Sequence, residues 1–154
     1  MSKKEKKYYS YDEALERLRK YCAYQDRCHS EVRTKLIELG TYGEDLEQII
    51  VVLIEENFLD ELRFAISYAR GKFRYKKWGK YKIRQGLKRK KISEYCIKKA
   101  MQEIDTLFYE DTLTDLLEKK NNRLKETNIW KRRKKLADFA MVKGYESKLV
   151  WKIV

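Results

Sequence analysis

The residues best suited to binding a ligand form one basic stretch, GKFRYKKWGKYKIRQGLKRKK, at residues 71–91. It contains eleven Lys or Arg residues and no Asp or Glu. Apolar and aromatic side chains such as Phe73, Trp78 and Leu87 recur through it, whereas a disordered basic tail normally lacks them. Cations beside aromatic faces suit a phosphate backbone or stacked single-stranded bases. They suit an acidic groove on a protein equally well.

The simpler interpretation is that Phe73, Trp78 and Tyr81 pack between helices while the cations are only solvated. A solvated face usually mixes the two signs of charge, so a stretch of this length without an acid favours a binding role. On a helix beginning near Lys80, Ile83 and Leu87 would face the core and the cations would point outward. The predicted contact residues are Arg74, Lys76, Lys77, Trp78, Lys80, Lys82, Arg84, Lys88 and Arg89.

A second basic cluster, KRRKK at residues 131–135, follows Trp130 and is expected to open a helix. Cations near a helix start oppose its dipole, at roughly a few tenths of a kcal/mol each, which favours a functional reason for them. Two positive clusters suggest a long binding surface rather than one pocket. The predicted contact residues here are Lys131, Arg132 and Arg133.

The whole chain of 154 residues carries 37 basic and 24 acidic residues, a formal net charge of +13. This excess favours a polyanionic partner: nucleic acid, an anionic membrane surface or an acidic protein face. The longest apolar run, Ile49–Ile54, is too short to span a bilayer, and the N-terminus does not read as a signal peptide. Three scattered cysteines are typical of reduced thiols. We therefore expect a cytoplasmic protein with no membrane partner.

Signatures of catalysis and metal binding are weak. Gly79-Lys80 lacks the residues that a phosphate-binding loop requires around it. The only histidine, His29, lies near Cys22 and Cys28, but the paired spacing of a structural zinc site is missing. Carboxylate pairs such as Glu55-Glu56, Asp60-Glu61 and Glu110-Asp111 are expected at helix ends, where capping and the dipole account for them. We predict no enzyme, no metal and no cofactor.

The elements that must position these residues read as helices throughout, since the chain has no Pro and only six Gly. Ser10 and Glu13 form a capping-box pattern before a helix predicted to end near Tyr24. Further helices are predicted from near Ser30 to Gly40 and over about 44–56, followed by others up to the C-terminus, with Ser93 as an N-cap. No hairpin signal interrupts them. The fold class is all-α.

Apolar positions of the second and third predicted helices recur 51 and then 53 residues later, and Gly40 corresponds to Lys91 and then to Gly144. The simplest architecture is three tandem three-helix repeats in an elongated, curved array. We expect a mobile basic N-terminal arm at 1–9, followed by repeats at 10–56, 57–107 (the basic one) and 108–154.

The segment at residues 57–92, NFLDELRFAISYARGKFRYKKWGKYKIRQGLKRKKI, resembles the centre of RecX regulatory proteins. The matching positions are Leu59, Asp60, Arg63, Phe64, Ala65, Tyr68, Arg70, Gly79, Ile83, Leu87 and Ile92. Residues 30–40 look like the first-repeat motif of that family, and residues 136–154 look like its C-terminal end. Lys91 departs from the pattern because the family has Gly there, which leaves that helix end without its usual cap. Glu61-Leu62 departs as well, replacing a more usual second acid followed by Glu.

The resemblance implies a non-catalytic tandem-repeat regulator that binds the RecA recombinase filament on single-stranded DNA, in the groove of the filament. Family members modulate RecA, mostly by inhibiting its ATP hydrolysis, strand exchange and co-protease activity, and so act in DNA repair, recombination and the SOS response. We expect a monomer that contacts RecA and single-stranded DNA. The alternative is a general nucleic-acid-binding helical-repeat protein that does not need RecA.

Overall fold

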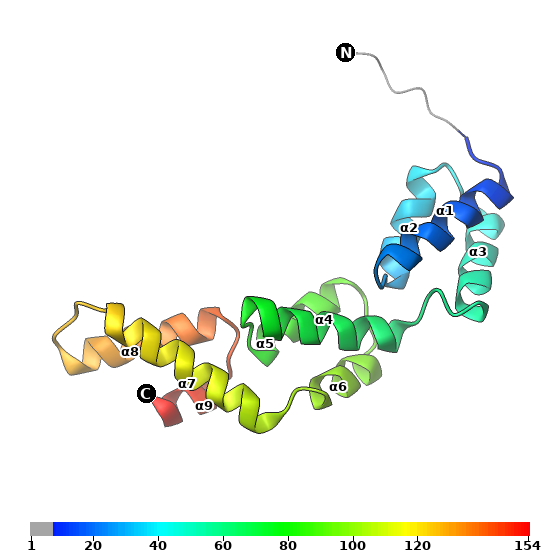
Figure 1. Ribbon diagram of the computed structural model, residues 1–154. Helices are drawn as coiled ribbons and strands as arrows, with labels where there is room; N and C mark the ends of the chain where they lie inside the picture. The colour runs from blue at the N-terminus through cyan, green and yellow to red at the C-terminus, as the bar shows by residue number, and fades with distance from the viewer. Residues whose placement is uncertain (1–7) are drawn as a thin grey trace, which may run out of the picture. The chain divides into compact units, whose positions relative to one another are not determined.

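The computed structural model describes residues 8–154, and these residues form helices joined by short connections, without a strand (Figure 1). The helices of this range are α1 (Tyr11–Tyr24), α2 (His29–Glu38), α3 (Gly43–Glu55), α4 (Glu61–Lys76), α5 (Lys80–Arg89), α6 (Glu94–Gln102), α7 (Thr106–Arg123), α8 (Ile129–Val142) and α9 (Ser147–Ile153). The prediction of an all-α protein is confirmed for this part of the chain. Most of the predicted N-terminal arm, residues 1–7, lies outside it.

Helix ends follow the capping residues of the sequence. At the start of α1, the Ser10 hydroxyl accepts a hydrogen bond from the Glu13 amide at 3.2 Å and Glu13 accepts from the Ser10 amide at 3.3 Å, as predicted. The Ser93 hydroxyl caps α6 by accepting from the amide of Cys96. Gly40 follows α2 with a φ of 82°, the left-handed conformation that glycine adopts without a Cβ clash. Local sequence therefore determines where these helices start and stop.

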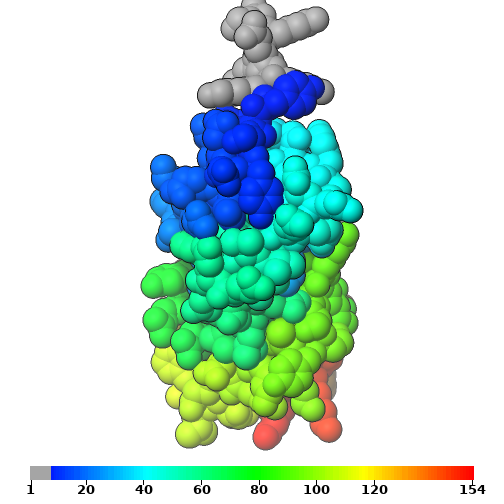
Figure 2. Space-filling view, turned by 90° about the vertical axis from the view of Figure 1, so that its right-hand side faces the viewer, coloured from blue at the N-terminus to red at the C-terminus, as the bar shows by residue number. Residues whose placement is uncertain are grey.

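Two units of the chain pack internally, and the first comprises residues up to Phe64 together with 90–92. Its core lies between α1, α2 and α3, whose spaced apolar residues, such as Leu18, Leu36 and Leu53, are fully buried. Arg33 on α2 pairs with Glu47 on α3 at 2.6 Å. In Figure 2 the blue surface of α1 meets the cyan surface of the residues around 40 without a visible gap. This unit is a complete three-helix bundle.

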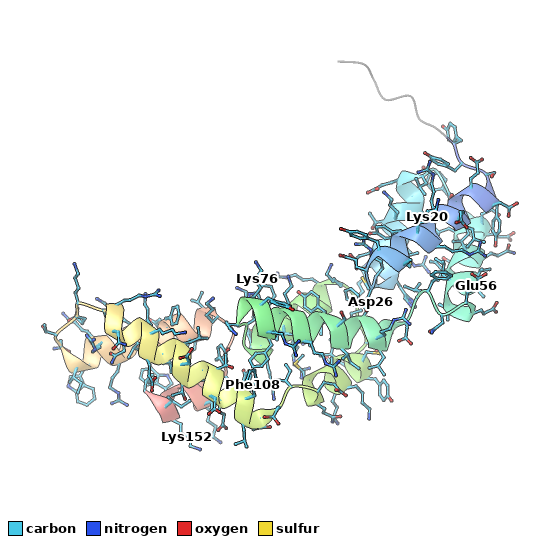
Figure 3. The ribbon with its side chains drawn as sticks, in the orientation of Figure 1. Lys20, Asp26, Glu56, Lys76, Phe108 and Lys152 are labelled. Carbon is cyan, nitrogen blue, oxygen red and sulfur yellow. The ribbon has the colours of Figure 1, made fainter. Side chains whose placement is uncertain are left out.

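The second unit comprises residues 65–89 and 93–154, and so contains most of α4 and all of α5–α9. The predicted core residues Ile83 and Leu87 of α5 are fully buried. An aromatic cluster joins α4 to α7, since the ring of Phe73 lies 5.8 Å from that of Phe108 and 5.7 Å from that of Tyr109. Figure 3 shows Phe108 on the side of α7 that faces α4. The basic stretch is thus anchored to α7 by aromatic packing.

Among the helices of residues 8–154, none combines the length and the apolar character that crossing a membrane requires.

Candidate functional site

The α4–α5 link (residues 77–79) is hydrogen-bonded to the turn between α8 and α9. The Gly79 amide donates to the Lys143 carbonyl at 2.8 Å, and the Tyr81 amide donates to the Gly144 carbonyl at 2.9 Å. These bonds pair backbone groups that a surface loop would otherwise leave to water. The middle of the basic stretch is therefore held in a fixed conformation.

A second layer of contacts, formed by tyrosine side chains, secures the same junction. Tyr109 of α7 is buried, and its hydroxyl accepts from the Lys80 amide at 2.9 Å while donating to the Glu146 carboxylate. The Tyr145 hydroxyl donates to the Lys77 carbonyl at 2.9 Å. Burial raises the pKa of Tyr109 and of Tyr145, and for Tyr109 the bond to Glu146 raises it further. Both hydroxyls therefore stay protonated and can donate throughout the ordinary pH range.

Four of the predicted contact residues leave their charge exposed to solvent. Within residues 8–154 no carboxylate forms a salt bridge with any of them, and all four are exposed: Arg74, Lys76, Lys77 and Arg89. Figure 3 shows Lys76 extending away from the end of α4. Because no acid of this part of the chain neutralises them, these side chains are available to an anionic partner.

Two other predicted contacts share one carboxylate. Arg84 lies 3.1 Å and Lys88 lies 3.7 Å from the two oxygens of Glu94, the first residue of α6. Exposed ion pairs of this kind contribute about 0–1 kcal/mol, so a strong anionic ligand can displace them. Arg84 and Lys88 thus already have a salt-bridge partner within the protein. Arg74, Lys76, Lys77 and Arg89, which have none among residues 8–154, are called the uncommitted cations below.

Lysines of the stretch lie over the rings of Trp78 and of Tyr109 on α7. The ammonium groups of Lys72 and Lys82 lie 4.9 and 4.6 Å from the ring centre of Trp78, and that of Lys80 lies 4.9 Å from the ring centre of Tyr109. Trp78 is half-buried, and its ring attracts the ammonium groups of both lysines by cation–π contact. Cation–π contact fixes where these ammonium groups sit without neutralising them.

The second basic cluster is divided between internal and external roles. Arg132 donates to the side chain and the carbonyl of Asn121, both at 2.6 Å, and to two further carbonyls, which closes the end of α7 onto α8. The guanidinium of Arg133 lies 5.8 Å from the ring centre of Trp130. Lys131 is exposed. The role predicted for Arg132 in binding stays a prediction, but its guanidinium already has a structural function.

The two clusters lie on different parts of the second unit. Lys131 is in the first turn of α8, whereas Lys143, which accepts from the α4–α5 link, follows its last turn. At a rise of 1.5 Å per residue, about 18 Å separates them along the helix. The α8–α9 turn therefore holds the α4–α5 link of the basic stretch, and Lys131 and Arg133 form a second, distant set.

Metal binding and acid catalysis gain no support within residues 8–154. These residues hold no group of three or more His, Cys, Asp or Glu that could bind a metal. Burial raises the pKa of Cys22 to about 11 and also raises that of Cys28, which disfavours the thiolate that metals need. The expectation that each acid pair lies at a helix end was wrong for Glu110-Asp111, which lies inside α7.

Sequence reasoning missed the residues that hold the basic stretch in place, namely Tyr109, Tyr145, Glu146 and Lys143. Tyr109 contacts a residue 29 positions away and Tyr145 one 68 positions away, and helical periodicity carries no information on such pairings. The available signal was weak: a small residue, Gly79, in the middle of a highly charged segment, which suggests a close backbone approach.

Comparison with known proteins places these features in a family. Residues 60–101 match the domain described as "RecX, second three-helix domain" and residues 109–154 match "RecX, third three-helix domain". Together the matched ranges span more than half of the chain, and they confirm the prediction of tandem three-helix units.

Individual relatives agree. The regulatory protein RecX of Clostridium perfringens (strain 13 / Type A) is 34% identical over 122 residues, which cover 78% of this chain and 57% of the relative. A crystal structure of regulatory protein RecX matches with a TM-score of 0.84 at 27% identity, covering 93% of this chain and 70% of the other. The structure of RecX from Lactobacillus salivarius matches in fold, with a TM-score of 0.85 at 22% identity and 93% coverage of both chains.

The chain spans about half to three fifths of the length of the curated relatives that it matches. Their shared name describes a regulator and not an enzyme, in agreement with the prediction that this chain is not catalytic. Two consecutive domain matches, curated relatives and the fold all point the same way. The chain belongs to the RecX family of regulatory proteins.

Proposed function

We propose that this protein binds the RecA recombinase filament on single-stranded DNA and inhibits its ATP hydrolysis, strand exchange and co-protease activity. Membership of the RecX family supports a regulatory role toward RecA. The protein would act without its own catalysis or cofactor, as a cytoplasmic monomer lying in the filament groove. The three repeats would be residues 10–56, 57–107 and 108–154.

The observation that carries this proposal is a rigid basic junction with uncompensated charge. The α4–α5 link is fixed by backbone bonds to the α8–α9 turn, while Arg74 and Lys76 in the last turn of α4, and Arg89 at the far end of α5, meet no carboxylate of residues 8–154. Ordering such cations in advance lowers the conformational entropy lost on binding. A filament on DNA offers phosphates and acidic protein surface together, which suits point charges anchored on helices.

The test is ATP hydrolysis by the cognate RecA on single-stranded DNA, with this protein added at substoichiometric ratios. The variant neutralises three uncommitted cations at once: Arg74→Gln, Lys76→Gln and Arg89→Gln. Its matched control removes the same charge from exposed lysines outside both clusters: Lys20→Gln, Lys98→Gln and Lys148→Gln. Because the variant and the control each lose three positive charges, any difference in inhibition between them reports the position of the cations and not the net charge.

We expect the wild type and the control to suppress ATP turnover when far fewer than one molecule of this protein is added per RecA. The triple variant should need several-fold more protein for the same suppression. If the wild type leaves turnover unchanged but binds DNA, the protein is a general nucleic-acid binder independent of RecA. If control and variant lose inhibition equally, only the total charge matters and the junction is not the contact surface.

A further inference from the structure

Two lysines of the basic stretch occupy backbone conformations that lysine normally avoids. Within residues 8–154, positive φ angles occur at three glycines, at Asn57 and at two lysines, Lys77 (57°) and Lys91 (62°). Gly and Asn adopt this left-handed region readily, whereas a longer side chain brings its Cβ against the backbone. Both lysines lie just beyond the end of a helix, where glycine is the usual residue.

The chain itself shows that this position does not need a lysine. Lys91 follows α5 as Gly40 follows α2 and Gly144 follows α8, at intervals of 51 and 53 residues. The φ angles at the two glycines are 82° and 100°, in the same left-handed region. The helix dipole favours a cation near a C-terminus, but the last turn of α5 already supplies Lys88 and Arg89. The fold therefore gains little from Lys91.

The side chain of Lys91 is also uncommitted. It is exposed and lines a surface pocket of the first unit together with Arg33 and Lys90. Arg33 is bonded to Glu47, and the ammonium of Lys90 lies 3.9 Å from a carboxylate oxygen of Glu31. Lys91 pairs with no carboxylate of residues 8–154, so its charge is the one in this pocket that remains free for a ligand.

Lys77 shows the same combination in the second unit. Its carbonyl accepts from the Tyr145 hydroxyl, and the next residue but one, Gly79, is fixed to Lys143, so the backbone at Lys77 is held on both sides. Its side chain is exposed and forms no salt bridge with a residue of the described range. The protein holds a strained residue firmly and directs its ammonium group to solvent.

We propose that Lys77 and Lys91 each contact a phosphate of single-stranded nucleic acid, and that their left-handed conformations are retained for this contact at a cost in stability. Strain that the fold itself does not need tends to persist at functional sites. A lysine ammonium is a compact charge with three donors and suits a single phosphate. The choice of nucleic acid as ligand rests on the proposed function, whereas the strain is a property of the backbone alone.

The experiment compares Lys77→Gly and Lys91→Gly with wild type in two measurements. Fluorescence anisotropy with a labelled oligo(dT) over a KCl series should show the slope of log K against log salt becoming shallower by about 0.7 for each lysine. Thermal unfolding should shift upward by about 2 °C, because glycine relieves the left-handed strain. Lys98→Gln, which removes one exposed helical cation, serves as the charge control and should leave the slope unchanged.

Three results would overturn this inference: an unchanged slope in both glycine variants, a lower unfolding temperature in both, or no binding of oligo(dT) by the wild type. The RecA ATPase measurement separates the two proposals. If the wild type suppresses RecA turnover while the glycine variants keep the full slope, the proposed function stands and this inference falls. If the slopes become shallower as expected while RecA turnover is unaffected, the phosphate contacts stand without RecA.

Discussion

Gly79 and Gly144 approach each other backbone to backbone, closer than any side chain would allow. A Cβ built on Gly79 would lie well under 3.0 Å from the carbonyl of Gly144, and one on Gly144 would meet Lys82 equally closely. Gly144 also has a φ of 100°, so two independent restraints select glycine there. Two small residues, 65 positions apart in the sequence, thus decide how the basic stretch is anchored.

Replacing Gly79 with Ala should separate the α4–α5 link from the α8–α9 turn. The added methyl group meets backbone atoms, which cannot rotate away, so we expect a loss of about 1–3 kcal/mol in the free energy of unfolding. The proposed inhibition of RecA should weaken as well, because the cations lose their fixed positions. Urea denaturation measures the first effect and the ATPase titration the second.

The matched control is Gly71→Ala. Gly71 lies inside α4, and a Cβ there would meet nothing within 4 Å. Alanine in a helix is more favourable than glycine by about 0.5–1 kcal/mol, so this variant should be more stable than wild type. Equal destabilisation by the two substitutions would contradict the special role of the Gly79 contact.

Replacing Tyr109 with Phe should reveal the contribution of its hydroxyl group. The ring contact with Phe73 remains, but the Lys80 amide loses its acceptor and Glu146 its donor. We expect a loss of about 1–3 kcal/mol in the free energy of unfolding, measured by urea denaturation. Tyr95→Phe is the control, since Tyr95 is exposed and should change stability by less than about 0.5 kcal/mol. A neutral Tyr109→Phe would mean that water replaces the hydroxyl at no cost.

Replacing Glu94 with Gln should strengthen binding to polyanions. Glu94 holds Arg84 and Lys88, and its removal leaves both cations free. We expect a two- to threefold gain in affinity for single-stranded DNA near 0.1 M salt, corresponding to an exposed ion pair worth about 0.5 kcal/mol. Glu44→Gln provides the same charge change in the first turn of α3 and should give a smaller gain. Anisotropy titrations with equal gains for both variants would show that Glu94 does not restrain its partners.

Helices, their ends and the buried positions of α5 could be predicted from sequence because the information for them is local. Ser10 with Glu13, Gly40 and the spacing of Ile83 and Leu87 each act within one or two turns. Which cations are free could not be predicted in this way. Arg132 bonds to oxygens six to eleven positions away, at the end of α7 and in the link to α8, and that choice depends on tertiary packing.

The cysteines of the first unit should be unreactive in the native protein. Burial raises the pKa of Cys22 from its ordinary value of about 9 to about 11, so at pH 8 its thiolate fraction is about a hundredfold lower than in the unfolded chain. An aromatic disulfide reagent at pH 8 should therefore modify Cys22 only after denaturation. Rapid modification of the native protein would show that the thiol is accessible.

The same shift predicts how stability depends on pH at the alkaline end. Because the folded state keeps the Cys22 proton to higher pH than the unfolded state, the stability from the neutral thiol is fully present below about pH 9 and is lost as pH rises through about 11. The buried hydroxyls of Tyr109 and Tyr145 act in the same direction at still higher pH, because their pKa is raised too. The difference in unfolding free energy between wild type and Cys22→Ala, measured from pH 8 to 11, isolates the thiol. It should shrink as pH rises, and a constant difference would rule out a protonated thiol as the cause.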